Sequence, residues 1–76
     1  MAREQRIEIL AEMVANVLVV EVVVGDIVDI GDTVVLLESM KMEIPVMAEV
    51  AGTVTSVKIA AGDVVQEGDP LVELTS

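Results

Sequence analysis

The chain lacks three kinds of residue that carry much of protein chemistry, because none of its 76 residues is aromatic, cysteine or histidine. Without Phe, Tyr or Trp, the core has to be built from Val, Ile, Leu and Met, and a valine-rich core favours strands over helices. Without cysteine, disulfides and thiolate metal sites are excluded. Without His, Cys and Tyr, most general acids, bases and nucleophiles are missing, so an enzyme is the weakest interpretation.

Basic residues are also scarce: four Lys and Arg stand against 14 Asp and Glu, a formal net charge of -10. This charge argues against nucleic acid or an anionic membrane as a partner. Residues 1–6 lack the apolar run of a signal peptide, and no apolar segment approaches the roughly 20 residues that cross a bilayer. We expect a cytoplasmic protein with a flexible N-terminus at 1–6 and one small domain at 7–76.

Short apolar segments separated by Gly-Asp pairs predict strands. Residues 7–13 partly alternate between polar and apolar, as an edge strand does, and the nearly continuous apolar run 17–24 predicts a strand buried on both faces. Further strands are predicted at 27–30, at 33–38 and from Ile44 onward. Pro45 argues for an edge there, since it cannot donate a hydrogen bond to a neighbour, and Pro70 is expected to begin the last strand.

The second half of the chain repeats the first. An offset of 37 places residues 7–39 on residues 44–76 without a gap, and 13 of these 33 positions are identical, where composition alone gives about three. Gly25-Asp26 falls on Gly62-Asp63, and Gly31-Asp32 falls on Gly68-Asp69. In such pairs glycine supplies a positive φ and aspartate bonds its own backbone, so they predict tight turns.

Two similar four-strand units predict a small antiparallel sandwich in which the units pair face to face about an approximate two-fold axis. The absence of a gap indicates that neither unit carries an inserted protrusion. The core should contain the apolar residues that the offset superimposes, namely Val17 with Val54, Val20 with Val57, Val28 with Val65, Val35 with Val72, and Leu37 with Leu74.

Lys41 lies in the connection between the two units, where the repeat supplies no counterpart within the aligned region. We therefore expect it to project from one end of the sandwich, with the two termini at the other end. Met40 and Lys41 would form a tight hairpin that lacks the Asn-Gly chemistry preferred at positive φ, a local cost tolerated for function. Met40 and Met42 are expected to be exposed; the alternative is that they fill gaps in the core.

The stretch Glu38-Ser39-Met40-Lys41-Met42-Glu43, followed by Gly52-Thr53-Val54 and flanked by the duplicated Gly-Asp turns, resembles the biotinyl-carrier family of biotin/lipoyl attachment domains. The resemblance covers residues 7–76 and is closest to the short free-standing biotinylated carriers of actinobacteria. It implies an all-β hammerhead fold, a flattened barrel-sandwich of two four-stranded antiparallel sheets. The biotinyl-lysine would sit on a tight hairpin, with no protruding thumb.

The resemblance also implies a function. A biotin protein ligase would attach biotin to Lys41, a biotin carboxylase would load it with carboxylate, and a carboxyltransferase would pass the carboxylate on, as in acyl-CoA carboxylases. Met40 and Met42 would present the lysine, and Glu38 and Glu43 are possible recognition residues for the ligase. The chain itself would be a non-catalytic carrier, monomeric by itself.

Two alternative functions stay open. One is a lipoyl carrier, which shares the fold, although lipoyl carriers usually have Asp-Lys-Ala where this chain has Met-Lys-Met. The other is an unmodified sandwich that serves as an adaptor. The aspartates at 26, 29 and 32 lack the spacing of a calcium loop, so no metal site is expected. Ala15 stands where many relatives have glycine, which leaves the backbone at that bend undecided.

Overall fold

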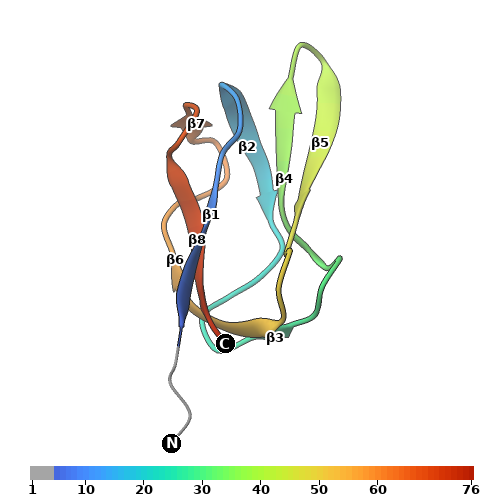
Figure 1. Ribbon diagram of the computed structural model, residues 1–76. Coiled ribbons are helices and arrows are strands. Elements are labelled where there is room, and N and C mark those ends of the chain that lie inside the picture. Colours follow the sequence, from blue (N-terminus) through green and yellow to red (C-terminus); the bar gives the residue numbers. More distant parts are fainter. Residues whose placement is uncertain (1–4) are drawn as a thin grey trace, which may run out of the picture.

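The computed structural model describes residues 5–76, and within them the chain forms strands and no helix (Figure 1). The strands are β1 (Arg6–Leu10), β2 (Ala15–Val20), β3 (Ile27–Val28), β4 (Thr33–Ser39), β5 (Met42–Met47), β6 (Gly52–Val57), β7 (Val64–Val65) and β8 (Pro70–Thr75). They build two four-stranded antiparallel sheets, which confirms the predicted all-β sandwich. Accordingly, residues 5–76 include no helix that could span a membrane.

The two halves of the chain are interlocked rather than stacked as separate units. One sheet has the order β1-β8-β6-β3 and the other β5-β4-β2-β7, so each sheet takes two strands from each half. The hydrogen bonds repeat accordingly: Gly25 N donates to Val54 O, and its counterpart Gly62 N donates to Val17 O, both at 2.8 Å. The approximate two-fold axis therefore exchanges the two sheets, and the expected face-to-face pairing of intact units is wrong.

The Gly-Asp pairs form the predicted turns. Gly25 has a φ of 100°, Asp26 N donates to Val23 O at 3.1 Å, and Val23 N donates back to Asp26 Oδ2 at 3.0 Å. The same reciprocal pair of bonds closes the turns at Asp32, Asp63 and Asp69. These carboxylates are thus occupied by the backbone, and no cluster of three potential metal ligands occurs within residues 5–76.

The core is a thin layer of aliphatic side chains between the sheets. Four of the five predicted pairs are buried, whereas Val20 and Val57 only pack against the rim of the core. Val34 and Leu71 are completely buried although the repeat did not single them out. Val34 precedes buried Val35 directly, and a register shift in the pairing of β4 with β5 at this point allows consecutive residues to face inward.

The prediction of a doubly buried strand at 17–24 is wrong. β2 ends at Val20, and Val19, Val23 and Val24 are 42, 65 and 62% exposed. A two-layer sandwich leaves the outer face of each sheet to solvent, so an apolar run there need not be buried. The apolar residues that suggested burial on both faces lie on the outer face of a sheet or in a turn.

The ends of the domain differ slightly from the expected boundaries. β1 begins at Arg6, one residue earlier than expected, and Ser76 N donates to Gln5 O at 3.0 Å. Residues 1–4 lie outside the described part of the chain, so the division into a flexible 1–6 and a domain 7–76 stays a prediction.

Ala15 is a regular, buried residue of β2, which settles the backbone at this position. At its counterpart Gly52, an added Cβ would lie 2.8 Å from the carbonyl oxygen of Thr75, which is closer than side chains approach. The two halves therefore differ here for a steric reason: the second requires glycine and the first accommodates a methyl group.

The turn glycines should matter more for stability than the nearby acidic residues. Replacing Gly25 or Gly62 by Val forces a branched side chain to a positive φ, and we expect a loss of about 1–2 kcal/mol in the free energy of unfolding. Asp29→Ala removes only a bond to the neighbouring Ile30 N and is the control. Thermal unfolding should place the glycine variants several degrees lower; equal melting temperatures would contradict the argument.

Candidate functional site

The hairpin between β4 and β5 is closed by only two residues, Met40 and Lys41. Ser39 and Met42 lie opposite each other at its base, and the two turn residues have φ values of 52° and 64°. These values agree with the predicted positive φ and belong to the mirror-image turns whose twist matches that of paired strands. Each residue is held at a cost of about 1–2 kcal/mol, because a Cβ crowds the carbonyl in this conformation.

The tip of the β4–β5 hairpin lies at one end of the sandwich, and the start of β1 and the end of β8 lie at the other (Figure 1). Through the offset of 37, the Ser39 and Met42 pair corresponds to Ser76 and Gln5, which are joined by a backbone hydrogen bond of 3.0 Å. The base of the hairpin and the Gln5 and Ser76 pair are therefore counterparts in the two-fold symmetry. As predicted, the hairpin tip projects from the end of the sandwich opposite the ends of the described chain.

The side chains around Lys41 are exposed. Met40 is 91% exposed and Met42 is 65% exposed, so the alternative that they fill gaps in the core is wrong. Lys41 is also exposed. Methionine is flexible and polarisable, and exposed methionines suit surfaces that meet more than one partner. The primary amine is thus presented between two adaptable apolar side chains.

Glu38 and Glu43 lie directly opposite each other at the base of the hairpin, on the outer face of the sheet. Glu38 is half-buried and Glu43 is exposed. Like charges directly opposite on neighbouring strands are destabilising, so the pair does not serve the stability of the hairpin. Asn16 of β2 lies opposite Glu38 and extends this polar row. No sequence pattern indicates this position, because only the strand register brings Asn16 next to Glu38.

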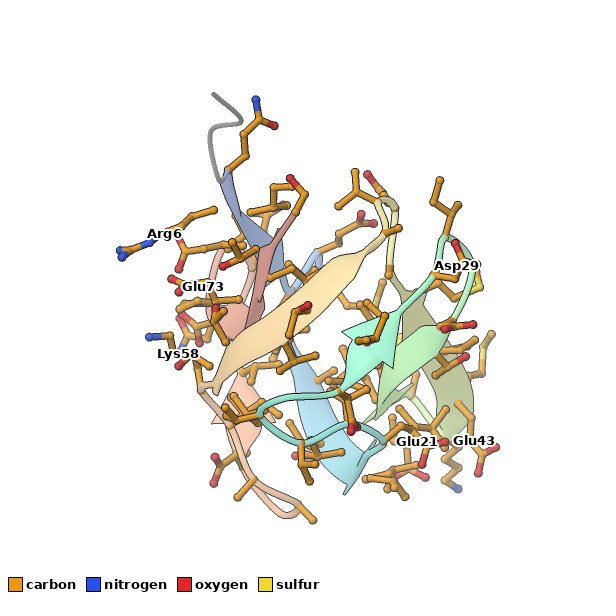
Figure 2. All side chains as sticks on the ribbon, turned by 90° about the horizontal axis from the view of Figure 1, so that it is seen from below. Arg6, Glu21, Asp29, Glu43, Lys58 and Glu73 are labelled. Carbon is orange, nitrogen blue, oxygen red and sulfur yellow. The ribbon has the colours of Figure 1, made fainter. Side chains whose placement is uncertain are left out.

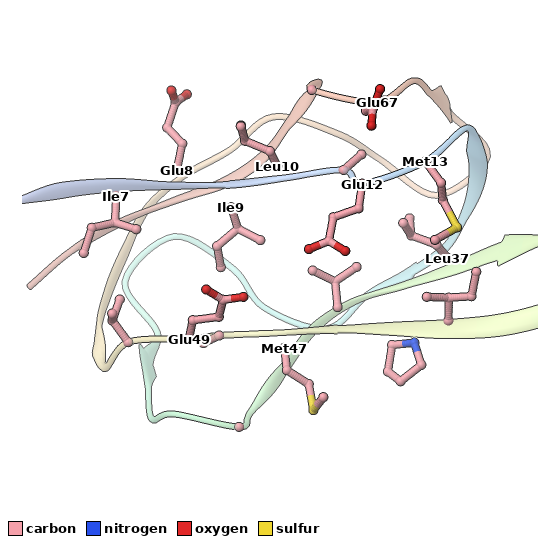
Figure 3. A pocket seen from close by; sticks show the side chains of 18 of the residues that line it. Ile7, Glu8, Ile9, Leu10, Glu12, Met13, Leu37, Met47, Glu49 and Glu67 are labelled. Carbon is pink, nitrogen blue, oxygen red and sulfur yellow. The ribbon is translucent and has the colours of Figure 1, made fainter.

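A groove on another part of the molecule is not part of this site. It runs between the edge strands β1 and β5, with the carboxylates of Glu12 and Glu49 directed into it (Figure 3). Nearly all of its lining consists of residues related by the offset of 37, such as Ile9 with Val46. The groove is therefore the gap that the two-fold symmetry leaves between two facing edges, and it contains none of the hairpin residues 40–42.

This arrangement suits a substrate for acylation better than a catalyst. An accessible amine is held on a short, stiff turn, and the groups next to it are thioethers and carboxylates. The hairpin offers neither an oxyanion hole nor a polarised nucleophile and base pair of the kind that enzymes use. A small group attached to the amine would extend into solvent from a fixed point.

Curated proteins similar in sequence come from mycobacteria. Over 38 residues the chain is 66% identical to biotinylated protein TB7.3 of Mycobacterium tuberculosis, and equally to the TB7.3 homolog of Mycolicibacterium smegmatis. The Mycobacterium leprae homolog is 60% identical over the same length. Each match covers 50% of this chain and 54% of the relative, so the chain spans about half the length of the curated relatives it matches.

Two solved structures share the fold over nearly the whole chain. A single-chain, multi-domain long-chain acyl-CoA carboxylase superimposes with a TM-score of 0.87 at 31% identity, over 92% of this chain and 7% of that protein. The urea carboxylase of Kluyveromyces lactis gives 0.86 at 28% identity, over 97% of this chain and 6% of that enzyme. In both, the matched part is a small portion of a large carboxylase.

A family model described as biotin-requiring enzyme, which covers biotin and lipoyl attachment domains, matches residues 7–74. This is almost the whole domain and includes the hairpin, both sheets and all four Gly-Asp turns. The chain therefore belongs to the biotin/lipoyl attachment family of biotin-requiring enzymes, as a carrier domain rather than a catalyst.

Proposed function

We propose that Lys41 is the residue to which biotin is covalently attached in this carrier. The observation that carries the proposal is the two-residue hairpin, which holds an exposed amine at the end of the sandwich despite an unfavourable backbone conformation. The only other lysine of the chain, Lys58, follows β6 directly, at the side of a sheet rather than on a turn tip. The hairpin thus distinguishes one lysine from the other.

Attachment would proceed by acyl transfer. The unprotonated Nζ of Lys41 attacks the carbonyl carbon of an activated biotin carboxylate, a C–N bond forms, and the activating group leaves with the bonding electrons. Nζ then loses a proton to give a neutral amide. A biotin protein ligase would supply both the activated acyl group and the base. The product has one positive charge fewer, so the formal charge of the chain changes from -10 to -11.

Biotin, once attached, supplies a ring nitrogen that can carry a carboxyl group between two active sites. The stiff hairpin contributes a fixed starting point for this arm, and the neutral amide no longer carries the lysine charge. We assign the loading step to a biotin carboxylase and the unloading step to a carboxyltransferase of the acyl-CoA carboxylase type. The match to a domain of a long-chain acyl-CoA carboxylase supports this assignment.

The flanking residues have separate roles in this proposal. Met40 and Met42 form an exposed apolar surface on both sides of the lysine, which the ligase and the carboxylase subunits would contact in turn. Glu38 and Glu43 would be recognised by the ligase through basic side chains. The repulsion between these two carboxylates across the hairpin lowers the stability of the fold, and recognition by the ligase would account for both being present despite that cost.

Replacing the lysine should abolish modification without affecting the fold. In protein purified from its native host, intact mass should show a biotinyl increment, and Lys41→Ala should lose it together with streptavidin binding. Lys58→Ala is the matched control and should keep both. A lipoyl increment would instead support the lipoyl alternative, and an unmodified wild-type chain would support the adaptor alternative.

Stability and modification should respond in opposite directions at the hairpin. Met40→Gly relieves a side chain held at positive φ, so we expect the free energy of unfolding to rise by up to about 1 kcal/mol. The same change removes an exposed contact beside Lys41, so biotin incorporation should slow. Met42→Gly, within β5, is the control and should lower stability instead. Thermal unfolding and initial rates of incorporation measure both; a destabilised Met40→Gly would contradict the argument.

A further inference from the structure

The outer faces of the two sheets differ although their backbones are related by symmetry. On the sheet β5-β4-β2-β7, Val19 lies opposite Leu36, and Leu36 lies opposite Pro45. These three residues form a continuous line across three strands, here called the apolar row. Val19 is 42% exposed, Pro45 is exposed and Leu36 is half-buried. The row is therefore accessible on the surface of the molecule.

The other sheet provides an internal comparison. The counterparts of the apolar row are Ser56, Glu73 and Glu8, and they lie opposite one another in the same register. Each row lies next to a register shift that leaves one residue without a partner in the strand pairing. This residue is Leu18 beside the apolar row and Thr55 beside its polar counterpart. Thr55 Oγ1 donates to Glu73 Oε1 at 3.0 Å. The same backbone thus tolerates polar residues at all these positions, so the fold does not require the apolar row.

Charge also separates the two faces. Figure 2 shows Arg6, Lys58 and Glu73 projecting on one side, and Glu21 and Glu43 projecting on the other. Of the three basic residues within 5–76, Arg6 and Lys58 therefore lie on the polar side and Lys41 lies at the tip. The charged residues that border the apolar row are carboxylates: Glu38 and Glu43 lie toward the hairpin, beside the neutral Asn16, and Glu21 lies beyond the end of β2. A partner that covers it should carry basic side chains around an apolar centre.

The apolar row is close to Lys41 on the same two strands. About four residue steps separate Leu36 from the tip, which corresponds to roughly 13 Å of strand. A standard interface covers about 800 Å² on each partner, a disc roughly 16 Å in radius. An enzyme whose active site receives the Lys41 amine itself therefore also covers the apolar row. An enzyme that acts only on the far end of a group attached to Lys41 does not have to contact the row.

We propose that the apolar row Val19, Leu36 and Pro45 is the docking surface for the enzyme that acylates Lys41. That enzyme presents an apolar patch to the row and basic side chains to Glu38 and Glu43. This proposal rests on the proposed function of Lys41. It assigns the asymmetry between the sheets to recognition of one partner, and it places the contact on one flat face beside the hairpin as well as on the hairpin itself.

The test places threonine at symmetry-related positions on the two faces. One variant combines Val19→Thr with Leu36→Thr, and the matched control combines Ser56→Thr with Glu73→Thr at the symmetry-related positions. Threonine suits strands, so both variants should remain folded, which thermal unfolding verifies. With the biotin ligase of the native host, we expect kcat/KM for biotin transfer to fall about tenfold in the first variant, mainly through KM, and to stay unchanged in the control.

The possible results separate the two proposals. If the wild type is modified and the first variant has the same kcat/KM, the docking surface is overturned and the function of Lys41 is left intact. The same holds if kcat/KM falls equally in the first variant and in the control. No transfer to wild type overturns both. Size-exclusion chromatography adds a third result: a wild-type dimer that the first variant converts to a monomer would show that a second copy covers the row, and would also overturn the proposal.

Discussion

The hydrogen bonds that each half of the chain makes with the other half hold this structure together. Val54 N donates to Asp26 O while Gly25 N donates to Val54 O, and the counterpart bonds join Val17 to the turn at Gly62 and Asp63, all at 2.8 Å. Neither half can complete a sheet alone, because both sheets contain strands from both halves. The Gly-Asp turns therefore do more than reverse the chain: each one forms backbone hydrogen bonds with a residue in, or directly after, a strand of the opposite half.

This interlocking explains how a strained hairpin persists. β4 lies between β5 and β2 in its sheet, and its residue Leu37 is 1% exposed. The base of the hairpin is thereby fixed on both sides, and Met40 and Lys41 have no freedom to relax without opening paired strands. Strain at functional sites survives when the surrounding structure determines it in this way. The result is an amine held at a defined point, which a carrier with a mobile arm needs at its origin.

Much of this could be predicted from the sequence, and the exceptions share a cause. The offset of 37 identified the turns, most of the core, the hairpin and its place opposite the termini, because these depend on local patterns that occur twice. It did not show that the halves exchange strands, since similarity between two halves does not state which edges pair. The run 17–24 was misjudged for a related reason: periodicity reports apolar character, and only the layer order decides whether Val19 faces a core or solvent.

A fold with internal symmetry offers a way to separate residues that maintain structure from residues that serve another purpose. Where both halves keep the same residue, as at the buried pair Leu37 and Leu74, the shared environment accounts for it. Where they differ on equivalent backbone, stability alone does not decide, because the counterpart shows what else the position accepts. Leu36 and Glu73 are such a pair, at the centre of opposite outer faces. Lys41 is the extreme case, since it lies in the connection between the two aligned segments and has no counterpart within them. The features that break the symmetry gather at the hairpin and on the sheet that carries it, so the half-exposed apolar residues there are best understood together with the lysine.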